Sequence, residues 1–299
     1  MSRIVARSSE SRSRTRPATE VPVRLCTFKP KGSGPADATP GRVEGDQVVR
    51  LEAPSLQAVL AVSGQVADGP RFPLDDVELL APVPEPPAVR DFFAFERHVA
   101  TARALHGAAV PDEWYEIPVF YFSNPAAIYG PDAEIPYPSG TVMLDYELEV
   151  AAVIKEGGGI GGFTVMNDWS ARDLQRKETR VGLGPAKGKD FATSIGPFLV
   201  TPEEFDGAHG EMVARVNGEE RSRGNLSELY HSWETMMARA AENTRLRPGD
   251  IIGSGTVGTG CILEHGDGRW LRPGDVVELE VEGLGVLRNR IGEGDGHAL

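Results

Sequence analysis

Apolar and polar positions alternate over much of this chain, and such alternation predicts short β-strands. The pattern is clearest in residues 144–154, LDYELEVAAVI. Because successive side chains of a strand point to opposite faces, the carboxylates of Asp145, Glu147 and Glu149 would share one face. Three neighbouring carboxylates repel one another unless a cation lies beside them. This face is therefore expected either to bind a divalent metal or to be balanced by Lys or Arg from a neighbouring element.

Helical spacing of apolar residues occurs in four stretches, at residues 55–62, 92–106, 168–180 and 226–243. A five-residue motif, LRPGD, occurs at 246–250 and again at 271–275. Proline and glycine suit the two central positions of a type II turn, and each copy precedes an apolar segment. We therefore expect a turn followed by a strand at both places, and a C-terminal third that is rich in β-structure.

A proline-rich segment divides the chain. Residues 81–87, APVPEPP, contain four prolines, and proline interrupts both helices and sheets. We place a boundary there, between a small β-rich N-terminal domain at 21–82 and a larger domain at 88–292. Residues 1–20 are rich in Arg and Ser, and they are expected to form a disordered arm rather than a transit peptide. The expected fold class is mixed, β-rich α+β.

Composition and charge narrow the classes of partner. The formal net charge of -13 disfavours binding to nucleic acid, because an acidic chain repels phosphate backbones. No apolar run reaches the roughly 18 residues that span a membrane. Cys26 and Cys261 form no CxxC pair, so neither a disulfide framework nor a zinc ribbon is expected. We expect a cytoplasmic protein that binds a small molecule.

A second acidic segment follows at 167–175, NDWSARDLQ. Asn167 or Asp168 could cap a helix that starts there. Within such a helix Asp168, Arg172 and Gln175 would lie on one face, since they are spaced four and three residues apart. This spacing is typical of a capping residue followed by an ion pair. The same side chains could instead provide a metal ligand and two groups that bind an anionic substrate.

His98 is the candidate general base, because histidine changes its protonation near neutral pH. It follows Asp91 by seven residues, which corresponds to two turns and one face of a helix. A general base needs a partner that orients its other ring nitrogen, and Glu264 is a candidate from far along the chain. Lys189, in a glycine-dense loop, could stabilise a developing oxyanion. The glycine-dense loops match neither the Walker nor the Rossmann pattern.

Together these segments resemble the fumarylacetoacetate hydrolase family. The resemblance covers about residues 85–292 and rests on several motifs in the family's order. These motifs are Asp91 to His98, LDYELE at 144–149, NDWSARD at 167–173, GKDF at 188–191, GSGT at 253–256 and LRPGD at 271–275. The resemblance implies a C-terminal domain with the β-sandwich roll of that family, which is usually dimeric, so a homodimer is expected.

The resemblance also implies roles for particular residues. It implies that Mg²⁺ or Ca²⁺, with Mn²⁺ as a third option, is bound by the carboxylates of Asp91, Glu147, Glu149 and Asp168. Asp145 is not among the family's ligands. It implies that His98, held by Glu264, is the base that activates water. The family's oxyanion and substrate contacts correspond to Lys189, Arg172, Gln175, Tyr121, Gly255 and Thr256.

The reaction implied by the resemblance is hydrolysis of a carbon–carbon bond in a β-diketo acid of the fumarylacetoacetate or acylpyruvate type. One departure bears on the substrate: Phe93, which cannot donate a hydrogen bond, replaces a substrate-binding tyrosine of the family's fumarylacetoacetase branch. A related diketo or oxo acid is therefore expected as the substrate as readily as fumarylacetoacetate itself. Two alternatives remain for the same residues. One is an oxo-acid decarboxylase or a hydroxydienoate isomerase or hydratase, and the other is a non-enzymatic module that binds small acids with a metal.

Residues 96–114 carry His98 on a polar, Ala-rich stretch with Gly107 near its middle. We expect this segment to act as a lid that becomes ordered when substrate binds. High mobility of residues 100–113 relative to the sheet would agree with this expectation, and a tightly buried segment would contradict it.

Overall fold

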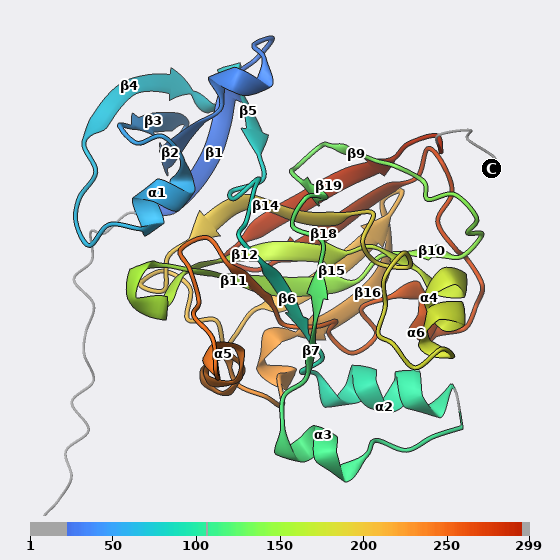
Figure 1. Ribbon diagram of the computed structural model, residues 1–299. Coiled ribbons are helices and arrows are strands. Elements are labelled where there is room, and N and C mark those ends of the chain that lie inside the picture. The colour runs from blue at the N-terminus through green and yellow to red at the C-terminus, as the bar shows by residue number, and fades with distance from the viewer. Residues whose placement is uncertain (1–22, 106, 295–299) are drawn as a thin grey trace, which may run out of the picture.

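The computed structural model describes residues 23–105 and 107–294 of the chain. The expected β-rich α+β class is confirmed, since most elements are strands and the helices are short (Figure 1). The α-helices are α1 (Leu56–Leu60), α2 (Glu96–Ala104), α3 (Asp112–Glu116), α4 (Arg172–Thr179), α5 (Trp233–Ala241) and α6 (Ile262–His265). Short 3-10 helices lie at Pro35–Asp37, Leu74–Asp76, Glu156–Gly158 and Leu226–Glu228. The arm expected at 1–20 lies outside the described residues.

The strands form one large sheet, one smaller sheet and a short two-stranded ribbon. The 12-stranded sheet runs β4 (Asp68–Pro73), β3 (Gln47–Leu51), β2 (Thr39–Glu44), β1 (Arg24–Pro30), β14 (Thr193–Val200), β12 (Ile160–Asp168), β11 (Leu148–Ile154), β17 (Ile251–Gly253), β6 (Val89–Phe92) and β7 (Phe120–Ser123), while β5 (Val77–Leu80) pairs with β1 and β8 (Ile128–Tyr129) with β14. The 5-stranded sheet runs β16 (Glu219–Asn225), β15 (Glu211–Val216), β18 (Val276–Val281), β19 (Gly285–Ile291) and β9 (Glu134–Ile135). The ribbon joins β10 (Leu144–Asp145) to β13 (Ser170–Ala171).

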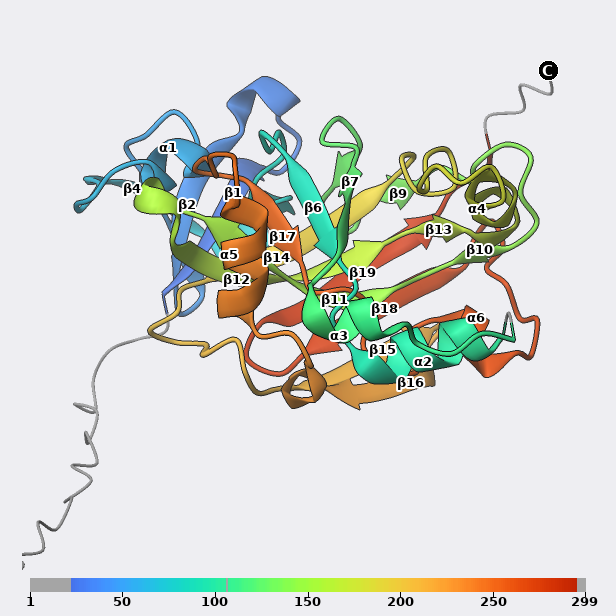
Figure 2. The ribbon, with the colours of Figure 1, turned by 60° about the horizontal axis from the view of Figure 1, so that its bottom comes forward.

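The two larger sheets pack face to face around the main apolar core. Strands β11, β12 and β14 contact β15, β18 and β19, and the layers are visible in Figures 1 and 2. Leu148 and Val150 of β11 belong to the same buried cluster as Leu279 of β18 and Leu287 of β19. Every residue of β11 is buried. A strand covered on both faces holds its side chains in fixed positions. The side chain of Glu149 is therefore held in place.

The N-terminal unit is joined to the large domain by strand pairing. β1 pairs with β2 and β5 of its own unit and also with β14, where Arg24 lies opposite Val200 and Leu25 opposite Leu199. Because backbone hydrogen bonds continue across this junction, the sheet of the N-terminal unit extends the central sheet.

Both copies of the LRPGD motif form the expected turn before a strand. The N–H of Asp250 donates to the carbonyl oxygen of Arg247 (2.9 Å), and the N–H of Asp275 donates to that of Arg272 (3.1 Å). The glycines of the two turns have φ values of 89° and 90°, as a type II turn requires. Strand β17 follows the first turn and β18 follows the second.

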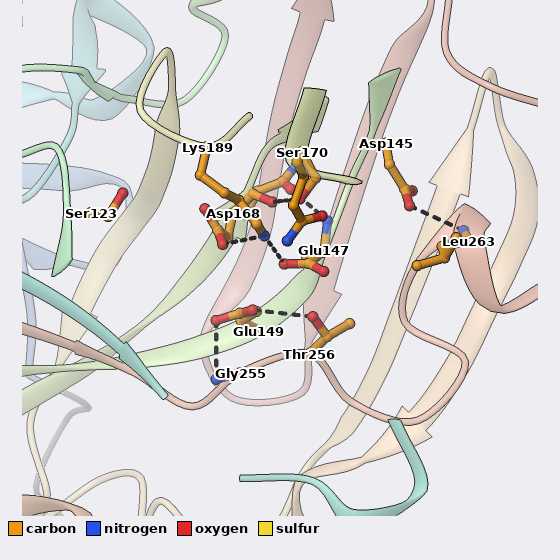
Figure 3. A network of polar contacts seen from close by, with 12 residues as sticks. Ser123, Asp145, Glu147, Glu149, Asp168, Ser170, Lys189, Gly255, Thr256 and Leu263 are labelled. Carbon is orange, nitrogen blue, oxygen red and sulfur yellow. Dashed lines mark hydrogen bonds and ion pairs between the residues drawn. The ribbon is translucent and has the colours of Figure 1, made fainter. Parts of the chain in front are cut away.

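The predicted strand at 144–154 is interrupted, which corrects the expectation of three carboxylates on one face. β10 pairs with β13, and β11 begins only at the third residue after β10 ends. Between them the N–H of Glu147 donates to the side-chain oxygen of Asn167 (2.9 Å). Asp145 points towards the backbone of α6 and away from Glu147 and Glu149 (Figure 3). The alternation was correct within β11 but did not continue through the break.

The prediction that Asp91 and His98 share a helical face is wrong. Asp91 lies in β6, where it pairs in parallel with Gly253 of β17. The helix of His98, α2, begins at Glu96. Pairing therefore keeps β6 a strand until shortly before the helix begins. The apolar spacing had assigned this stretch to helix alone.

The helical face expected for Asp168, Arg172 and Gln175 is also wrong. Asp168 is the last residue of β12, which pairs with both β11 and β14. Helix α4 begins at Arg172, and its N-cap is Ala171, so neither Asn167 nor Asp168 caps it. Pairing with β14, where Asp168 lies opposite Thr193, extends β12 to Asp168. Arg172 and Gln175 belong to a different element.

Candidate active site

Four carboxylates meet beside the central sheet. Asp91 is in β6, Glu149 in β11 and Asp168 at the end of β12, while Glu147 immediately precedes β11. One oxygen from each lies within 4.8 Å of the others, and all four residues are buried. Gly253 leaves the space that Asp91 occupies, because a Cβ there would lie 2.3 Å from Asp91 Oδ1. Three separate strands thus deliver four acidic groups to one point.

Two basic side chains balance part of this charge. Lys189 Nζ donates to Asp168 Oδ2 (2.5 Å) and to Glu147 (Figure 3). Arg172 Nη2 donates to Glu147 Oε1 (2.7 Å). Burial alone would raise the pKa of Glu147, but Arg172 and Lys189 hold that pKa well below its usual value. Glu147 is therefore ionised and held from both sides.

The donor set fits a hard divalent cation. Burial and the charge of Asp168 raise the pKa of Asp91 well above its usual value, and burial and Asp91 do the same for Glu149. Asp91 Oδ1 and Asp168 Oδ1 are buried and have no hydrogen-bond partner among the described residues. Buried polar atoms normally have a partner, and Mg²⁺ and Ca²⁺ prefer oxygen ligands. A cation among these oxygens would relieve both the repulsion and the missing contacts.

Three of the expected substrate contacts lie directly against the carboxylates. The hydroxyl of Tyr121, in β7, donates to Asp168 Oδ2 (2.6 Å). The N–H of Gly255 and the hydroxyl of Thr256 donate to the two oxygens of Glu149 (3.2 and 3.3 Å). Gly255 has a φ of 78°, and a Cβ there would lie 2.4 Å from a backbone oxygen, so this loop requires glycine. These residues position the cluster as well as lining the cavity beside it.

Asp145 connects the carboxylate cluster to helix α6. It is fully buried, and its oxygens accept the N–H groups of Ile262 (2.7 Å) and Leu263 (3.0 Å) at the start of that helix. Asp145 Oδ2 also accepts from Arg172 Nε (2.8 Å). Because Arg172 binds Glu147 as well, one guanidinium links Asp145 to the cluster.

Helices α2 and α6 contact each other (Figure 2), and this contact brings His98 and Glu264 together. His98 Nδ1 lies 3.0 Å from Glu264 Oε1, and their side chains are 5% and 2% exposed. The two groups are close but are not aligned for a hydrogen bond, so neither Nδ1 nor either oxygen of Glu264 has one among the described residues. The ring of Phe93 packs edge-on against the imidazole, with centroids 5.3 Å apart.

A cavity of about 680 Å³ opens beside these groups. Every predicted site residue lines it except Asp168 and Glu264, and these two contact residues that do. Gln175 lines the cavity from α4, and its side-chain oxygen accepts from Arg172 Nη1 (3.2 Å). Phe93 forms part of the wall, so the cavity has an apolar surface where the family's fumarylacetoacetase branch is expected to have a hydroxyl.

Two arginines that sequence reasoning missed also line the cavity. Arg103 comes from α2 and Arg176 from α4, both are exposed, and neither forms an ion pair with any described residue. A signal for Arg176 was available, because it follows Arg172 by four residues and so lies on the same side of the helix. No pattern in the sequence marks Arg103.

The segment 96–114 is anchored at both ends and exposed in between. His98 and Trp114 are buried, whereas Leu105 and residues 107–109 are exposed. The segment supplies several residues of the cavity wall. A role as a lid stays a prediction.

Comparison with protein families decides the identity of the fold. The family model described as fumarylacetoacetate (FAA) hydrolase, C-terminal, matches residues 88–292. The chain belongs to the fumarylacetoacetate hydrolase family. A second family model, described as Rv2993c-like, N-terminal, matches residues 24–82. Enzymes of the fumarylacetoacetate hydrolase family depend on a divalent metal, and the four-carboxylate cluster is a group that could hold one.

Several curated relatives are named as oxaloacetate tautomerases. The mitochondrial oxaloacetate tautomerase FAHD2A of Homo sapiens is 31% identical over 251 residues, which is 79% of this chain and 76% of that protein. The oxaloacetate tautomerase YisK of Bacillus subtilis is 29% identical over 238 residues, covering 74% of this chain and 75% of that protein.

Solved structures of the family share the whole fold. A fumarylacetoacetate hydrolase from Exiguobacterium antarcticum aligns with a TM-score of 0.75 at 26% identity, covering 91% of this chain and 99% of the other. A 5-carboxymethyl-2-hydroxymuconate delta-isomerase from Mycobacterium smegmatis aligns with a TM-score of 0.71 at 28% identity, covering 90% and 99%. These likenesses confirm the expected family fold with its N-terminal β-domain.

The comparisons establish an enzyme family and leave the reaction open. Several relatives are named as tautomerases or isomerases, so the expected hydrolysis does not follow from membership. A small acid as substrate is consistent with the family. Within residues 23–105 and 107–294 no helix is long and apolar enough to cross a membrane. The homodimer and the cytoplasmic location stay predictions.

Proposed function

We propose that this protein is a metal-dependent tautomerase or isomerase of a small 2-oxo dicarboxylic acid. The observation that carries the proposal is the convergence of His98, paired with Glu264, and an acidic cluster fit for a metal on one cavity. The relatives support the reaction class, because their names specify oxaloacetate, 5-carboxymethyl-2-hydroxymuconate and 2-hydroxyhepta-2,4-diene-1,7-dioate. Each of these is an acid with more than one carboxylate and an enolisable 2-oxo or 2-hydroxy group.

The proposed metal ligands are Asp91, Glu147, Glu149 and Asp168, and the proposed ions are Mg²⁺ or Ca²⁺, with Mn²⁺ as a third candidate. When bound, such an ion polarises a carbonyl group and stabilises negative charge on its oxygen. Tyr121, Gly255 and Thr256 would hold the ligand oxygens in place through the hydrogen bonds they already donate.

His98 would carry the proton that moves between the enol oxygen and the adjacent carbon. Its ring lines the cavity, and the carboxylate of Glu264 lies 3.0 Å from Nδ1. A buried carboxylate at this distance holds the imidazole ring in one orientation. Glu264 therefore serves to orient the base, without contacting the substrate.

Lys189, Arg172 and Gln175 are the proposed contacts to the reacting end of the substrate. Lys189 Nζ has three N–H donors and uses two on Glu147 and Asp168, which leaves one for an oxygen in the cavity. Gln175 uses its oxygen on Arg172 and keeps its amide N–H groups for an acceptor.

The second carboxylate of the substrate would bind Arg103 and Arg176. Both line the cavity, and neither forms an ion pair with a described residue. Arginine binds carboxylates with two parallel hydrogen bonds, so this pair favours a dicarboxylic acid over a monocarboxylic one.

Hydrolysis of a carbon–carbon bond is the second candidate, because the same His98 and Glu264 are suited to taking a proton from water. In that reaction His98 would activate the water, and Lys189 and Gln175 would stabilise the oxyanion of the tetrahedral intermediate. The substrate would be a β-diketo acid such as an acylpyruvate.

One experiment separates the candidates. The protein with Mg²⁺ is incubated with enol-oxaloacetate and with a panel of acylpyruvates, in D₂O and in ¹⁸O-labelled water. We expect faster enol–keto conversion with deuterium at the carbon next to the oxo group and no cleavage. Cleavage of an acylpyruvate with ¹⁸O in the newly formed carboxylate would establish the hydrolase instead. Binding of oxalate and Mg²⁺ without turnover of any acid would indicate a binding module.

A further inference from the structure

A second group of potential metal ligands lies behind His98 and is separate from the four-carboxylate cluster. His98 of α2, Glu264 of α6 and Cys261, the N-cap of α6, offer a ring nitrogen, a carboxylate oxygen and a sulfur that all lie within 4.8 Å of one another. Cys261 is fully buried, and the side chains of His98 and Glu264 are 5% and 2% exposed. Three different donor types therefore converge between two helices.

These donor atoms lack other partners. His98 Nδ1 and both oxygens of Glu264 are buried without a hydrogen bond among the described residues. Nδ1 and Oε1 lie 3.0 Å apart but are not aligned for a hydrogen bond, and buried polar atoms normally have one, so the arrangement favours a ligand that binds nitrogen and oxygen together. The thiol of Cys261 adds a sulfur donor, and this donor determines which class of ligand the site would bind.

We propose that His98, Cys261 and Glu264 form a binding site for a soft divalent cation of the Zn²⁺ class, and that this cation inhibits the enzyme. Thiolate and imidazole select zinc, whereas the all-oxygen cluster next to it suits Mg²⁺ or Ca²⁺. The donors of a tetrahedral zinc site stand about 3.5 Å apart. The present donor atoms lie within 4.8 Å of one another, so binding requires them to move closer together. Three protein donors leave the fourth tetrahedral position to water or another ligand.

Oxidation of the thiol is the rival use of Cys261. Burial and the charge of Asp145 raise the pKa of the Cys261 thiol well above its usual value. A neutral, buried thiol is a poor nucleophile and is inert to oxidants. A bound soft cation, in contrast, displaces the thiol proton itself.

Inhibition follows from the role of His98 and so rests on the proposed function. A cation held at Nδ1 places positive charge on the ring and occupies the carboxylate of Glu264. The imidazole then loses both its basicity and its counter-ion. Excess Mg²⁺ would not relieve this inhibition, because the two cations occupy different ligands.

Binding is tested with Cd²⁺, whose bond to a thiolate gives an ultraviolet charge-transfer band. The full chain, saturated with Mg²⁺, is titrated as the wild type, as Cys261→Ala and as Cys26→Ala, which removes the other buried cysteine. We expect the band in the wild type and in Cys26→Ala, and its loss in Cys261→Ala. Absence of the band from the wild type, or its persistence in Cys261→Ala, would overturn the site. If Cys261→Ala does not fold, Cys261→Ser takes its place.

Inhibition is tested separately with Zn²⁺. We expect Cys261→Ala to retain wild-type turnover with Mg²⁺ and to need at least about tenfold more Zn²⁺ for half-inhibition, which is the loss of one ligand at roughly 1.4 kcal/mol. Equal Zn²⁺ sensitivity of the wild type and Cys261→Ala would place the inhibition at the carboxylates and contradict the proposal. A thiolate band in a protein without turnover would support the site while refuting the proposed function.

Discussion

The two halves of the cavity are built in different ways. The metal-binding half is formed by β6, β11 and β12 of the central sheet, and hydrogen bonds from Lys189, Tyr121 and Gly255 hold its acids in place. The half with His98 and Glu264 comes from two short helices, and their facing atoms make no hydrogen bond within the described chain.

This difference matches two different tasks. A hard cation requires oxygen ligands at fixed positions, and strands paired on both sides provide them. A general base must accept and release a proton at a substrate that enters and leaves. We expect the two short helices, α2 within the partly exposed segment 96–114 and α6, to allow such adjustment. Asp145 and Arg172 are the bridge between the halves, since they bind α6 and Glu147 together.

The largest effect is expected from Glu149→Gln. This change removes a proposed ligand while keeping the shape of the side chain and one acceptor oxygen for the N–H of Gly255. Turnover should fall to background, and the rise in melting temperature on adding Mg²⁺ should disappear. Glu234→Gln, on the exposed side of α5, is the matched control. A Glu149→Gln protein that keeps its Mg²⁺-dependent stabilisation would show that the cation is bound elsewhere.

The next largest effect is expected from His98→Ala, which disrupts only the half of the cavity with His98 and Glu264. Loss of a general base typically lowers turnover by about 10²–10⁴-fold, while the Mg²⁺-dependent rise in melting temperature should persist. Steady-state kinetics and thermal melts measure the two quantities. His209→Ala, at an exposed histidine, should change neither. Full turnover by His98→Ala would refute the assignment of the base.

Asp145→Asn tests the bridge between the halves. Residues that orient a metal ligand from behind typically contribute about 10–100-fold, and turnover should fall within that range. The apparent affinity for Mg²⁺ and the pH profile of turnover should both change, because Asp145 contacts both Arg172 and α6. A loss of stability with unaltered kinetics would reduce Asp145 to a structural residue.

Arg176→Gln should affect only the binding of a dicarboxylate. A charge-assisted contact at an exposed position is worth about 1 kcal/mol, so KM for oxaloacetate should rise roughly fivefold with kcat unchanged. A monocarboxylic analogue should be unaffected, and Lys177→Gln, at the neighbouring exposed position, is the control. Equal losses for both substrates would exclude the proposed carboxylate contact.

The smallest effect concerns pH and stability. Burial together with neighbouring carboxylates raises the pKa of Asp91 and Glu149 in the folded protein. A raised folded-state pKa favours the protonated group, so the metal-free protein should lose stability as pH rises from about 4 towards the folded values. Mg²⁺ should reduce this loss, because it stabilises the ionised forms. Urea unfolding between pH 5 and 8, with and without Mg²⁺, measures the difference. If Mg²⁺ leaves the slope of the unfolding free energy against pH unchanged, the carboxylate cluster does not bind the cation.

Much of the fold was accessible from local patterns. Alternation located β11, the two LRPGD turns located β17 and β18, and apolar spacing located α5. The errors occurred at Asp91 and Asp168, where a strand extends into a stretch with helical spacing, and after Asp145, where the predicted strand is interrupted. Pairing with a strand that is distant in the sequence decides where such strands end. A pattern within a few residues contains no information about that pairing.

The sequence by itself determined the family and the chemical types at the site: acidic groups in ExE and NDW segments, one histidine, and a lysine in a glycine-rich loop. Only the tertiary structure decided which of these groups meet. It put Asp145 on the backbone of α6, put Lys189 on two carboxylates, set the His98–Glu264 distance, and brought Cys261 beside both. The reason is physical, since electrostatic and coordination contacts depend on distances of a few ångströms, and those distances are set by sheet pairing and helix packing between residues far apart in the chain.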